Sequence, residues 1–306
     1  MKHEPVLFTQ ILEYLEPNRS DGVLVDATVG LGGHAEGLLE RHPGVRLIAI
    51  DRDPEALERS RARLSRFGDR VTFVRGRHES LIDILKQYGV ATISGLLADL
   101  GVSSMQLDDA SRGFSFRFEG PLDMRMGSEG SSAADLVNTL DEYELTRIIR
   151  EYGEEPMARR IARAIVEART EAPIETTARL AEVIRGVKKP RFKEIDPSTL
   201  TFQALRIATN EELVGLDRFV DDAVSVLETG ARVAIISFHS LEDRIVKRAF
   251  RRLEGECTCP PNMPVCGCGA QTLVEILTGR PVTASEEELQ RNPRSRSAKL
   301  RVAERV

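Results

Sequence analysis

The sequence predicts an α/β fold in which a mostly parallel sheet is interrupted by an inserted helical domain and closed by an antiparallel pair of strands. Three observations predict it. Short apolar runs alternate with amphipathic stretches over residues 23–99, as in a parallel sheet with crossover helices. Only helical patterns follow over residues 108–209, and an apolar run at 232–237 resumes the sheet. Two further β runs, 272–277 and 299–302, lie too far apart for a two-residue hairpin but can pair antiparallel across a longer connection.

The elements of the sheet follow in order along the first third of the chain. Apolar runs predict four strands, at residues 23–26, 47–51, 71–75 and 95–99. Amphipathic stretches at 35–41, 54–64 and 81–88 predict the helices between them. Because ligands of open α/β sheets bind beyond the carboxyl ends of the strands, residues at those ends are the first site candidates.

The inserted segment carries helix-start signals. Asp141-x-x-Glu144 has the spacing of a capping box, Pro156 suits a first helical turn, and Thr176 suits a cap before a helix at 179–185. We therefore expect residues 1–107 and 210–306 to form the catalytic domain, and 108–209 to form an inserted helical domain that recognises the substrate. A helix over 211–228 is expected to end at Gly230.

Composition places the chain among ordinary folded proteins. Its 306 residues, 41% hydrophobic and 30% charged, suit one large domain or a domain with a substantial insertion. No apolar stretch approaches the ~20 residues that span a bilayer, and no secretion signal is recognisable at the start. These features predict a cytoplasmic protein without a membrane partner. A net charge of −5 argues against coating nucleic acid through bulk charge.

The stretch Asp26-Ala-Thr-Val-Gly-Leu-Gly-Gly-His34 is the strongest functional signal. Its glycines permit positive φ in a strand-to-helix turn and let backbone approach a nucleotide-like ligand. Gly30-x-Gly32-x-x-Ala35 also passes as a weak dinucleotide fingerprint, and Asp51 follows at the spacing of a ribose-binding carboxylate. A turn that merely joins a strand to a helix is the plain alternative.

Asp26 distinguishes between the two nucleotide-like ligands. A carboxylate just before the glycines attracts the sulfonium and ammonium groups of S-adenosylmethionine and repels a pyrophosphate. The sequence therefore favours a methyl donor over a dinucleotide, while a helix or turn cap remains the structural alternative for Asp26.

The loop after the fourth predicted strand, from Asp99 to Asp108, is expected to face the acceptor. Asp99 suits either the donor's ammonium group or the chemistry itself, and we favour the binding role. Methylation of a pyrimidine ring carbon requires a cysteine nucleophile, and this loop contains none, which favours an exocyclic amine as the acceptor.

Two further segments supply candidate substrate contacts. In Arg112-Gly-Phe-Ser-Phe-Arg-Phe118 the residues Phe114, Phe116 and Phe118 occupy alternating positions, the spacing of one strand face, with arginines interleaved. Such aromatics stack on bases in single-strand binders, although a small hydrophobic face is the more common meaning of this pattern. His239 follows the resumed strand and is interpreted either as a hydrogen-bonding substrate contact or as a structural residue. The serine-hydrolase elbow Gly-x-Ser-x-Gly is missing around it.

A positive helix face is predicted near the end of the chain. Its basic residues recur at steps of three and four: Arg244, Lys247, Arg248, Arg251 and Arg252. A second basic concentration lies at 291–301. Either can be a solvated face or a set of phosphate contacts.

The four cysteines of the chain, Cys257, Cys259, Cys266 and Cys268, gather in one proline-rich segment. Four thiolates suit zinc, but the pairs are spaced more closely than structural zinc ligands usually are. We expect reduced thiols and no metal.

Ten sequence words spread over the whole chain resemble the bacterial ribosomal small-subunit methyltransferase H family, also called MraW. They are His3-Glu-Pro-Val, Asp26-x-Thr-x-Gly-x-Gly-Gly-His34, Ile50-Asp-Arg-Asp-Pro54, Asp99-Leu-Gly-Val-Ser-Ser104, Arg112-Gly-Phe-Ser-Phe116, Pro121-Leu-Asp-Met-Arg-Met126, Tyr152-Gly-Glu-Glu155, Phe202-Gln-Ala-Leu-Arg-Ile207, Ser237-Phe-His-Ser-Leu-Glu-Asp-Arg244 and Asn292-Pro-Arg-Ser-Arg-Ser297. One word departs: relatives usually show His-Pro-Ala-Thr-Arg before Phe202, where this chain has Asp196-Pro-Ser-Thr-Leu200.

The resemblance implies a class I methyltransferase fold and S-adenosylmethionine-dependent N4-methylation of a cytidine in the decoding centre of 16S rRNA. It implies the small ribosomal subunit as partner, and not DNA. Donor contacts carry over to Gly32, Gly33, His34, Asp51, His78, Asp99 and Gln106. Arg112, Phe114, Phe116 and His239 become candidate substrate contacts, and Asp99 or Ser103 becomes the candidate acceptor of the amine's proton.

Two other functions remain open at this point. A nicotinamide-dependent oxidoreductase predicts NAD binding, and a non-catalytic ribosome-binding factor predicts RNA association that is indifferent to substitution of Asp51. The oligomeric state is also open, with a homodimer as one option.

Overall fold

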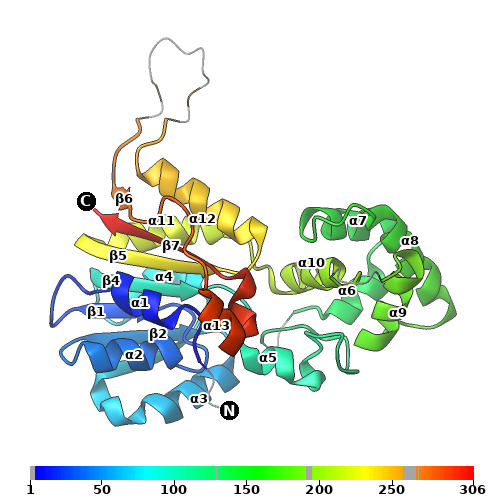
Figure 1. The fold of residues 1–306 in the computed structure, drawn as a ribbon, viewed down its shortest axis with the longest axis horizontal. Helices are drawn as coiled ribbons and strands as arrows, with labels where there is room; N and C mark the ends of the chain where they lie inside the picture. Colours follow the sequence, from blue (N-terminus) through cyan, green and yellow to red (C-terminus); the bar gives the residue numbers. More distant parts are fainter. Residues whose placement is uncertain (1–3, 128–129, 191–194, 258, 260–266, 268) are drawn as a thin grey trace. The chain divides into compact units, whose positions relative to one another are not determined.

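The computed structural model describes residues 4–127, 130–190, 195–257, 259, 267 and 269–306. The chain forms two compact units (Figure 1). The sheet unit comprises Met1–Gly101 and Gly215–Val306, and the helical unit comprises Val102–Val214.

A seven-stranded sheet with the order β3-β2-β1-β4-β5-β7-β6 is the frame of the sheet unit. The strands are β1 (Val23–Asp26), β2 (Arg46–Asp51), β3 (Val71–Arg75), β4 (Ile93–Asp99), β5 (Leu227–Ser237), β6 (Val274–Ile276) and β7 (Lys299–Arg305). The first five strands run parallel, and β7 is antiparallel to both β5 and β6. This is the class I S-adenosylmethionine-dependent methyltransferase fold, as predicted. The strand order reverses between β1 and β4, where ligands of such sheets bind.

Helices cover both faces of the sheet (Figure 1). One face carries α1 (Phe8–Tyr14), α2 (Gly33–Arg41) and α3 (Pro54–Leu64), which pack in sequence against one another. The other carries α4 (Leu81–Gln87), α11 (Leu216–Val226) and α12 (Ser240–Leu253). A short helix α13 (Glu286–Arg291) and the 3₁₀ turns η1 (Ser65–Arg70), η2 (His78–Ser80) and η4 (Pro293–Ser297) complete the unit.

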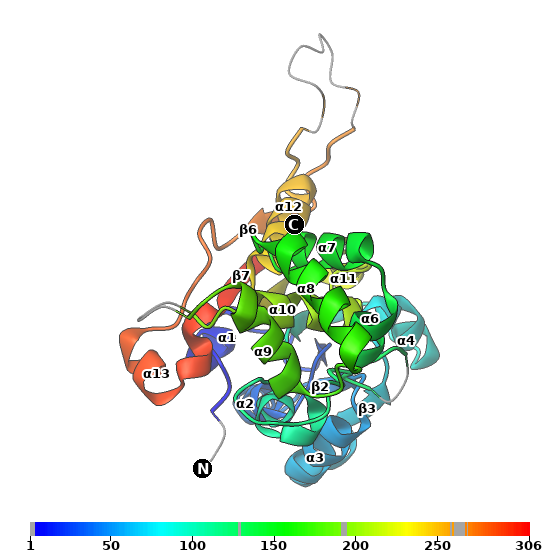
Figure 2. The same ribbon diagram turned by 90° about the vertical axis from the view of Figure 1, so that its right-hand side faces the viewer.

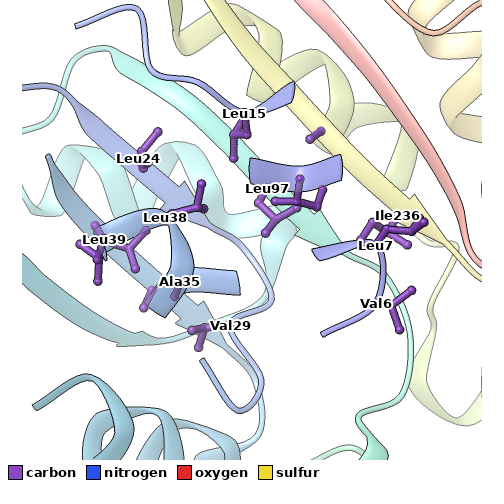
Figure 3. Packing of buried hydrophobic residues seen from close by; sticks show 14 of the residues in the cluster. Val6, Leu7, Leu15, Leu24, Val29, Ala35, Leu38, Leu39, Leu97 and Ile236 are labelled. Atoms are coloured by element: carbon purple, nitrogen blue, oxygen red, sulfur yellow. The ribbon is translucent and has the colours of Figure 1, made fainter. Parts of the chain in front are cut away.

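The core of the sheet unit forms because its strands are apolar on both faces. All four residues of β1 are buried, as are the first six of β4. Figure 3 shows Leu24 and Leu97 from these strands in one cluster with Leu38 of α2 and with residues near α1. The carboxyl ends of β1 and β4 are therefore held by a rigid, close-packed core.

Most predicted boundaries in the sheet unit are confirmed within one or two residues. Strands β1 and β3 and helix α3 span the predicted residues, and α2 begins two residues earlier than predicted, at Gly33. The antiparallel pair is also confirmed, with β7 running to Arg305.

The prediction that a helix spans 211–228 and ends at Gly230 is wrong. Helix α11 covers only Leu216–Val226, and β5 starts at Leu227. Gly230 has a φ of 81° inside β5, where the pairing with β4 shifts register in a bulge. A glycine at positive φ serves a bulge as well as a helix end, so sequence could not separate the two.

The helical unit has its own core. Its helices are α5 (Ser104–Asp108), α6 (Ala133–Thr139), α7 (Glu142–Glu151), α8 (Ala158–Glu171), α9 (Thr177–Val187) and α10 (Thr199–Asn210), with a 3₁₀ turn η3 (Ala110–Arg112). Figure 2 shows α6 to α10 gathered together, and α7, α8 and α9 pack in sequence. The cluster is entirely apolar and includes Leu145, Ile161 and Leu180, none of them exposed.

Two of the three predicted helix starts in this unit are confirmed. Asp141 accepts a hydrogen bond from the Glu144 amide at 2.8 Å, and Thr176 accepts one from the Arg179 amide at 3.2 Å. The prediction for Pro156 is wrong, because Met157 is the N-cap of α8 and the helix starts at Ala158. Across the described part of the chain, no helix combines the length and apolar character needed to cross a membrane.

Candidate active site

The glycine turn after β1 is fixed by backbone hydrogen bonds to two neighbouring strands. The Ala27 amide donates to the Leu97 carbonyl at 2.8 Å, and the Val29 amide donates to the Ile50 carbonyl at 2.8 Å. Gly32 then takes a φ of 74° as the N-cap of α2. The turn is therefore a rigid part of the carboxyl edge of the sheet.

The space beside these glycines is used mainly by the protein itself. A Cβ at Gly33 would lie 2.4 Å from the Pro5 side chain, and one at Gly32 would lie 3.3 Å from Ser60 and Leu64. At Gly30 a Cβ would meet only the Thr28 carbonyl, at 3.8 Å. Packing thus explains the absence of a side chain at Gly32 and Gly33, and open space for a ligand is left beside Gly30.

Asp51 ties the end of β2 to the glycine turn. Its Oδ2 accepts a hydrogen bond from the Gly30 amide at 2.8 Å, and its Oδ1 accepts one from the Asp53 amide at 2.9 Å. Burial raises the pKa of Asp51, and these amide hydrogen bonds oppose the rise. Each carboxylate oxygen keeps a further lone pair, so a ligand hydroxyl can still bind.

Asp99, at the end of β4, is the least satisfied acid of this edge. Its amide donates to Thr28 Oγ1 at 2.6 Å, but its buried Oδ1 has no hydrogen-bond partner among the described residues. Burial raises its pKa to about 7, and the negative charge of Glu242 adds to the rise. A buried carboxylate oxygen without a donor is costly, and an N–H group of a ligand would relieve that cost.

Asp26 lies at the end of β1 and is 2% exposed. Burial raises its pKa to about 8; the Thr28 amide, 3.2 Å from Oδ1, opposes the rise, and the charges of Asp99 and Asp51 add to it. Burial raises the pKa of all three acids, and the charges of Asp51 and Asp99 raise that of Asp26 further, so this edge strongly favours a cationic ligand. The sulfonium and ammonium groups of S-adenosylmethionine fit this edge.

His34 stands beside Asp99 at the start of α2. Its Nε2 lies 2.8 Å from the Val6 carbonyl, which can only accept, so Nε2 carries the hydrogen. Its Nδ1 lies 3.9 Å from Asp99 Oδ2. His34 thus links the N-terminal segment to the acid at the end of β4.

His239 and Glu242 cap α12, directly after β5. Glu242 N–H and His239 Nδ1 are 3.4 Å apart, and Glu242 Oε2 accepts from the Phe238 amide at 2.8 Å. Both side chains are buried. This reciprocal cap gives His239 a structural role, while its contact with substrate stays a prediction.

His78, in η2, is packed against α11. Its ring meets Phe219 edge-on with centroids 4.7 Å apart, and its buried Nε2 has no hydrogen-bond partner among the described residues. Burial lowers its pKa, so the neutral ring is favoured. A neutral imidazole suits a contact with an adenine edge, which stays a prediction.

In the helical unit, Ser103 and Gln106 cap α5. The Ser103 amide donates to Gln106 Oε1 at 2.9 Å, and the Gln106 amide donates to Ser103 Oγ at 3.2 Å. The Ser-x-x-Gln spacing signals such a box, and the sequence analysis missed it. A role for Ser103 as proton acceptor and for Gln106 in donor binding stays a prediction.

The expected aromatic strand of Arg112 to Phe118 is absent: this described segment is a 3₁₀ turn followed by a loop. Phe114 is 6% exposed in the core of the helical unit, and Arg112 Nη2 donates to the carbonyls of Arg125 and Met126 at 3.1 Å each. In this conformation Phe114 therefore serves the hydrophobic alternative rather than offering a ring to a base.

Phe116 is the aromatic of this group that borders a cavity. Its ring packs edge-on against Phe202, and the guanidinium of Arg185 lies 5.8 Å from its centroid. The cavity has a volume of about 690 Å³ and is lined by Phe116, Arg117, Arg185, Ile195, Asp196 and Thr199. Asp196, from the word that departs from the family pattern, holds Arg185 at 2.7 Å.

Two of the four clustered cysteines, Cys257 and Cys259, lie among the described residues. Cys257 is exposed and Cys259 is half-buried, with the Gly267 amide 3.3 Å from its Sγ. Cys266 and Cys268 lie outside the described residues, so the expectation of reduced thiols without a metal stays untested.

Comparison with known proteins identifies the family. The model of the MraW methylase family matches residues 1–306. The chain belongs to this family. A ribosomal RNA small subunit methyltransferase H of Pelobacter propionicus is 54% identical, covering 100% of this chain and 99% of the relative, and one of Geobacter sulfurreducens is 52% identical, covering 99% of each. Among solved structures, an rRNA methylase of Streptococcus thermophilus aligns over 100% of this chain and 99% of its own at 13% identity, with a TM-score of 0.41.

Membership in the MraW methylase family makes the chain a methyltransferase with S-adenosylmethionine as its cofactor. The nicotinamide-dependent alternative is thereby set aside. The acids predicted from sequence at the ends of β1, β2 and β4 are together at one edge of the sheet. Glu242 was missed, because in the sequence it looks like an ordinary capping residue three positions after His239.

Proposed function

We propose that the protein methylates the N4 amine of a cytidine in the decoding centre of 16S rRNA. The relatives named ribosomal RNA small subunit methyltransferase H support rRNA of the small subunit as the substrate class. The absence of cysteine from residues 99–108 supports an exocyclic amine over a ring carbon, because carbon methylation of a pyrimidine needs a cysteine nucleophile. This activity would place the enzyme in the cytoplasm.

The observation that carries the proposal is the bare acid at the end of β4. Asp99 Oδ1 is buried without a hydrogen-bond partner among the described residues, and burial raises the pKa of Asp99 to about 7. Bound S-adenosylmethionine would supply an electrophilic methyl group. Asp99 would then accept a hydrogen bond either from the ammonium group of the donor or from the amine of the acceptor base.

The remaining donor contacts follow from the same edge of the sheet. We assign Asp51 to the ribose hydroxyls, His78 to the adenine, and the turn at Gly32, Gly33 and His34 to the methionine part. Gln106 completes this set by family resemblance, and Arg112, Phe116 and His239 remain candidate contacts for RNA.

The reaction is tested with labelled donor and small ribosomal subunits that lack the modification. Mass spectrometry of the digested rRNA should reveal N4-methylcytidine in the decoding centre. Label in a ring carbon, in another nucleotide or in protein would reject the proposed acceptor. A non-catalytic ribosome-binding role predicts no label at all, and RNA association unaffected by Asp51→Asn.

The variant Asp99→Asn separates the two roles of Asp99. If Asp99 holds the donor, the Kd for S-adenosylhomocysteine should rise while single-turnover methyl transfer at saturating donor persists. If Asp99 takes the proton, the Kd should hold and the transfer rate should fall by about 10²–10⁴-fold.

A further inference from the structure

Helix α12 presents a strongly basic face on the side opposite to its buried one. The basic face comprises Arg244, Lys247, Arg248, Arg251 and Arg252. Val246, Ala249, Phe250 and Leu253 are buried on the other side, where α12 packs on α11 and the sheet. Figure 1 shows α12 beside α11 in the sheet unit. At 100° per residue the basic positions fall within an arc of roughly 140°, clear of the buried stripe.

The central cations of this face have no acidic partner within the part of the chain that the structure describes. Lys247, Arg248 and Arg251 form no ion pair or side-chain hydrogen bond with any residue that the structure describes, whereas Arg252 meets Asp221 at 2.6 Å. The acids of α12 itself, Glu242 and Asp243, lie in its first turn. Glu242 belongs to the cap, and Asp243 is held by Arg301 at 2.6 Å and Lys299 at 3.5 Å.

The exposed face of α3, also in the sheet unit, is instead neutralised locally. On α3, Arg59 pairs with Glu55 at 2.8 Å and Arg61 with Glu58 at 3.8 Å. Lys247, Arg248 and Arg251 thus concentrate positive charge without a described acidic partner on a chain whose net charge is −5. Like charges three and four residues apart destabilise a helix slightly. The basic face therefore lowers the free energy of the protein only when an anionic partner binds to it.

We propose that the basic face of α12 binds the phosphate backbone of the RNA substrate. This inference rests on the proposed function, which supplies a polyanionic partner. Residues 244–252 extend for about 12 Å along the helix, enough to follow three to four phosphates of one strand at 3.4 Å per nucleotide. On a chain of negative net charge, such a concentration of positive charge orients the RNA as well as holding it.

The test compares two triple variants of the full chain loaded with S-adenosylhomocysteine. The first, Lys247→Gln with Arg248→Gln and Arg251→Gln, removes the unpaired cations. The control, Arg41→Gln with Arg59→Gln and Arg61→Gln, removes the same charge from α2 and α3. The Kd for naked 16S rRNA is measured from 50 to 200 mM salt, alongside the Kd for S-adenosylhomocysteine.

The first variant should bind rRNA at least about tenfold more weakly at 0.1 M salt, and its log–log salt slope should shrink by about 2–3, for three lost phosphate contacts. The control variant should change neither the rRNA affinity nor the salt slope, and both triple variants should keep the wild-type affinity for S-adenosylhomocysteine. Equal losses in both variants, or none in the first, would overturn the proposal. If wild type binds rRNA through this face but yields no N4-methylcytidine, the proposed function fails while this inference stands.

Discussion

Asp26 and Asp99 are acids whose protonation is coupled to the cationic cofactor. Burial raises the pKa of Asp26 to about 8 and that of Asp99 to about 7. Without ligand, both carboxyls hold a substantial fraction of their protons at neutral pH. A cation that binds beside them must displace those protons.

We therefore expect the affinity for S-adenosylmethionine to rise between pH 6 and 7.5, by up to about tenfold per unit for each group that loses its proton. This range lies below the pH at which the donor's own amine loses its charge. Isothermal calorimetry in two buffers with different ionisation heats should detect proton release. S-adenosylhomocysteine, which lacks the sulfonium charge, is the control and should show a weaker dependence. An affinity for the donor that is flat over this range would contradict the electrostatic account.

Asp26 also affects stability without ligand. Its pKa is higher in the folded protein than its ordinary value of 3.8, so the folded state holds the proton more tightly. The corresponding stability is present below pH 4 and is lost as the pH rises toward 8.

Asp26→Asn should consequently raise the Tm relative to wild type by more at pH 8.5 than at pH 5.5, measured by differential scanning fluorimetry. The matched change Asp21→Asn, on a side chain 72% exposed, should show no such trend. An Asp26→Asn difference that is equal at both pH values would speak against a buried, protonated Asp26.

Sequence predicted correctly that Asp26, Asp51 and Asp99 end their strands, because a carboxylate after an apolar run marks the end of a buried strand. The lack of a described hydrogen-bond partner for Asp99 Oδ1 could not be predicted, since it depends on how Thr28 and His34 are placed around Asp99 in the folded protein. The pattern favoured a hydrophobic face for Phe114, which its burial confirms, but alternation alone could not distinguish a strand from a packed loop.

Among the elements, the junction of β4 and β5 depends on a close contact. Gly101 has a φ of 155°, and a Cβ there would lie 2.8 Å from the Phe238 ring. Phe238 is in turn fixed by Glu242, which accepts from its amide at 2.8 Å. The loop after Asp99 and the start of α12 are therefore mutually positioned.

Gly101→Ala should destabilise the protein by about 1–3 kcal/mol, because the ring must shift to admit a methyl group. Thermal unfolding should detect the loss, and Phe238→Leu in the same chain should restore part of it. Gly279→Ala is the control, since no atom lies within 4 Å of a Cβ there. Equal Tm values for the two single variants would show that the contact is loose.

For the whole molecule, the order of the elements was predictable because the sequence pattern changes from alternating to purely helical. Each of the two units has its own apolar cluster, so a substitution in the core of one unit should leave the other intact. Leu180→Ala removes a fully buried side chain from the helical unit and should cost about 2–5 kcal/mol there. The Kd for S-adenosylhomocysteine should remain unchanged, as measured by calorimetry. A large change would mean that cofactor binding needs the helical core intact.

The sheet unit is assembled from two stretches, Met1–Gly101 and Gly215–Val306, whereas the helical unit is one continuous stretch. During translation, β1 to β4 leave the ribosome long before β5 and β7, which pair beside them. Contacts so distant in sequence form slowly and late. The helical unit should thus reach its native state on the nascent chain while the early strands still wait for their partners. Brief proteolysis of chains stalled just after residue 214 has cleared the exit tunnel should leave residues 102–214 protected and the preceding strands cleaved.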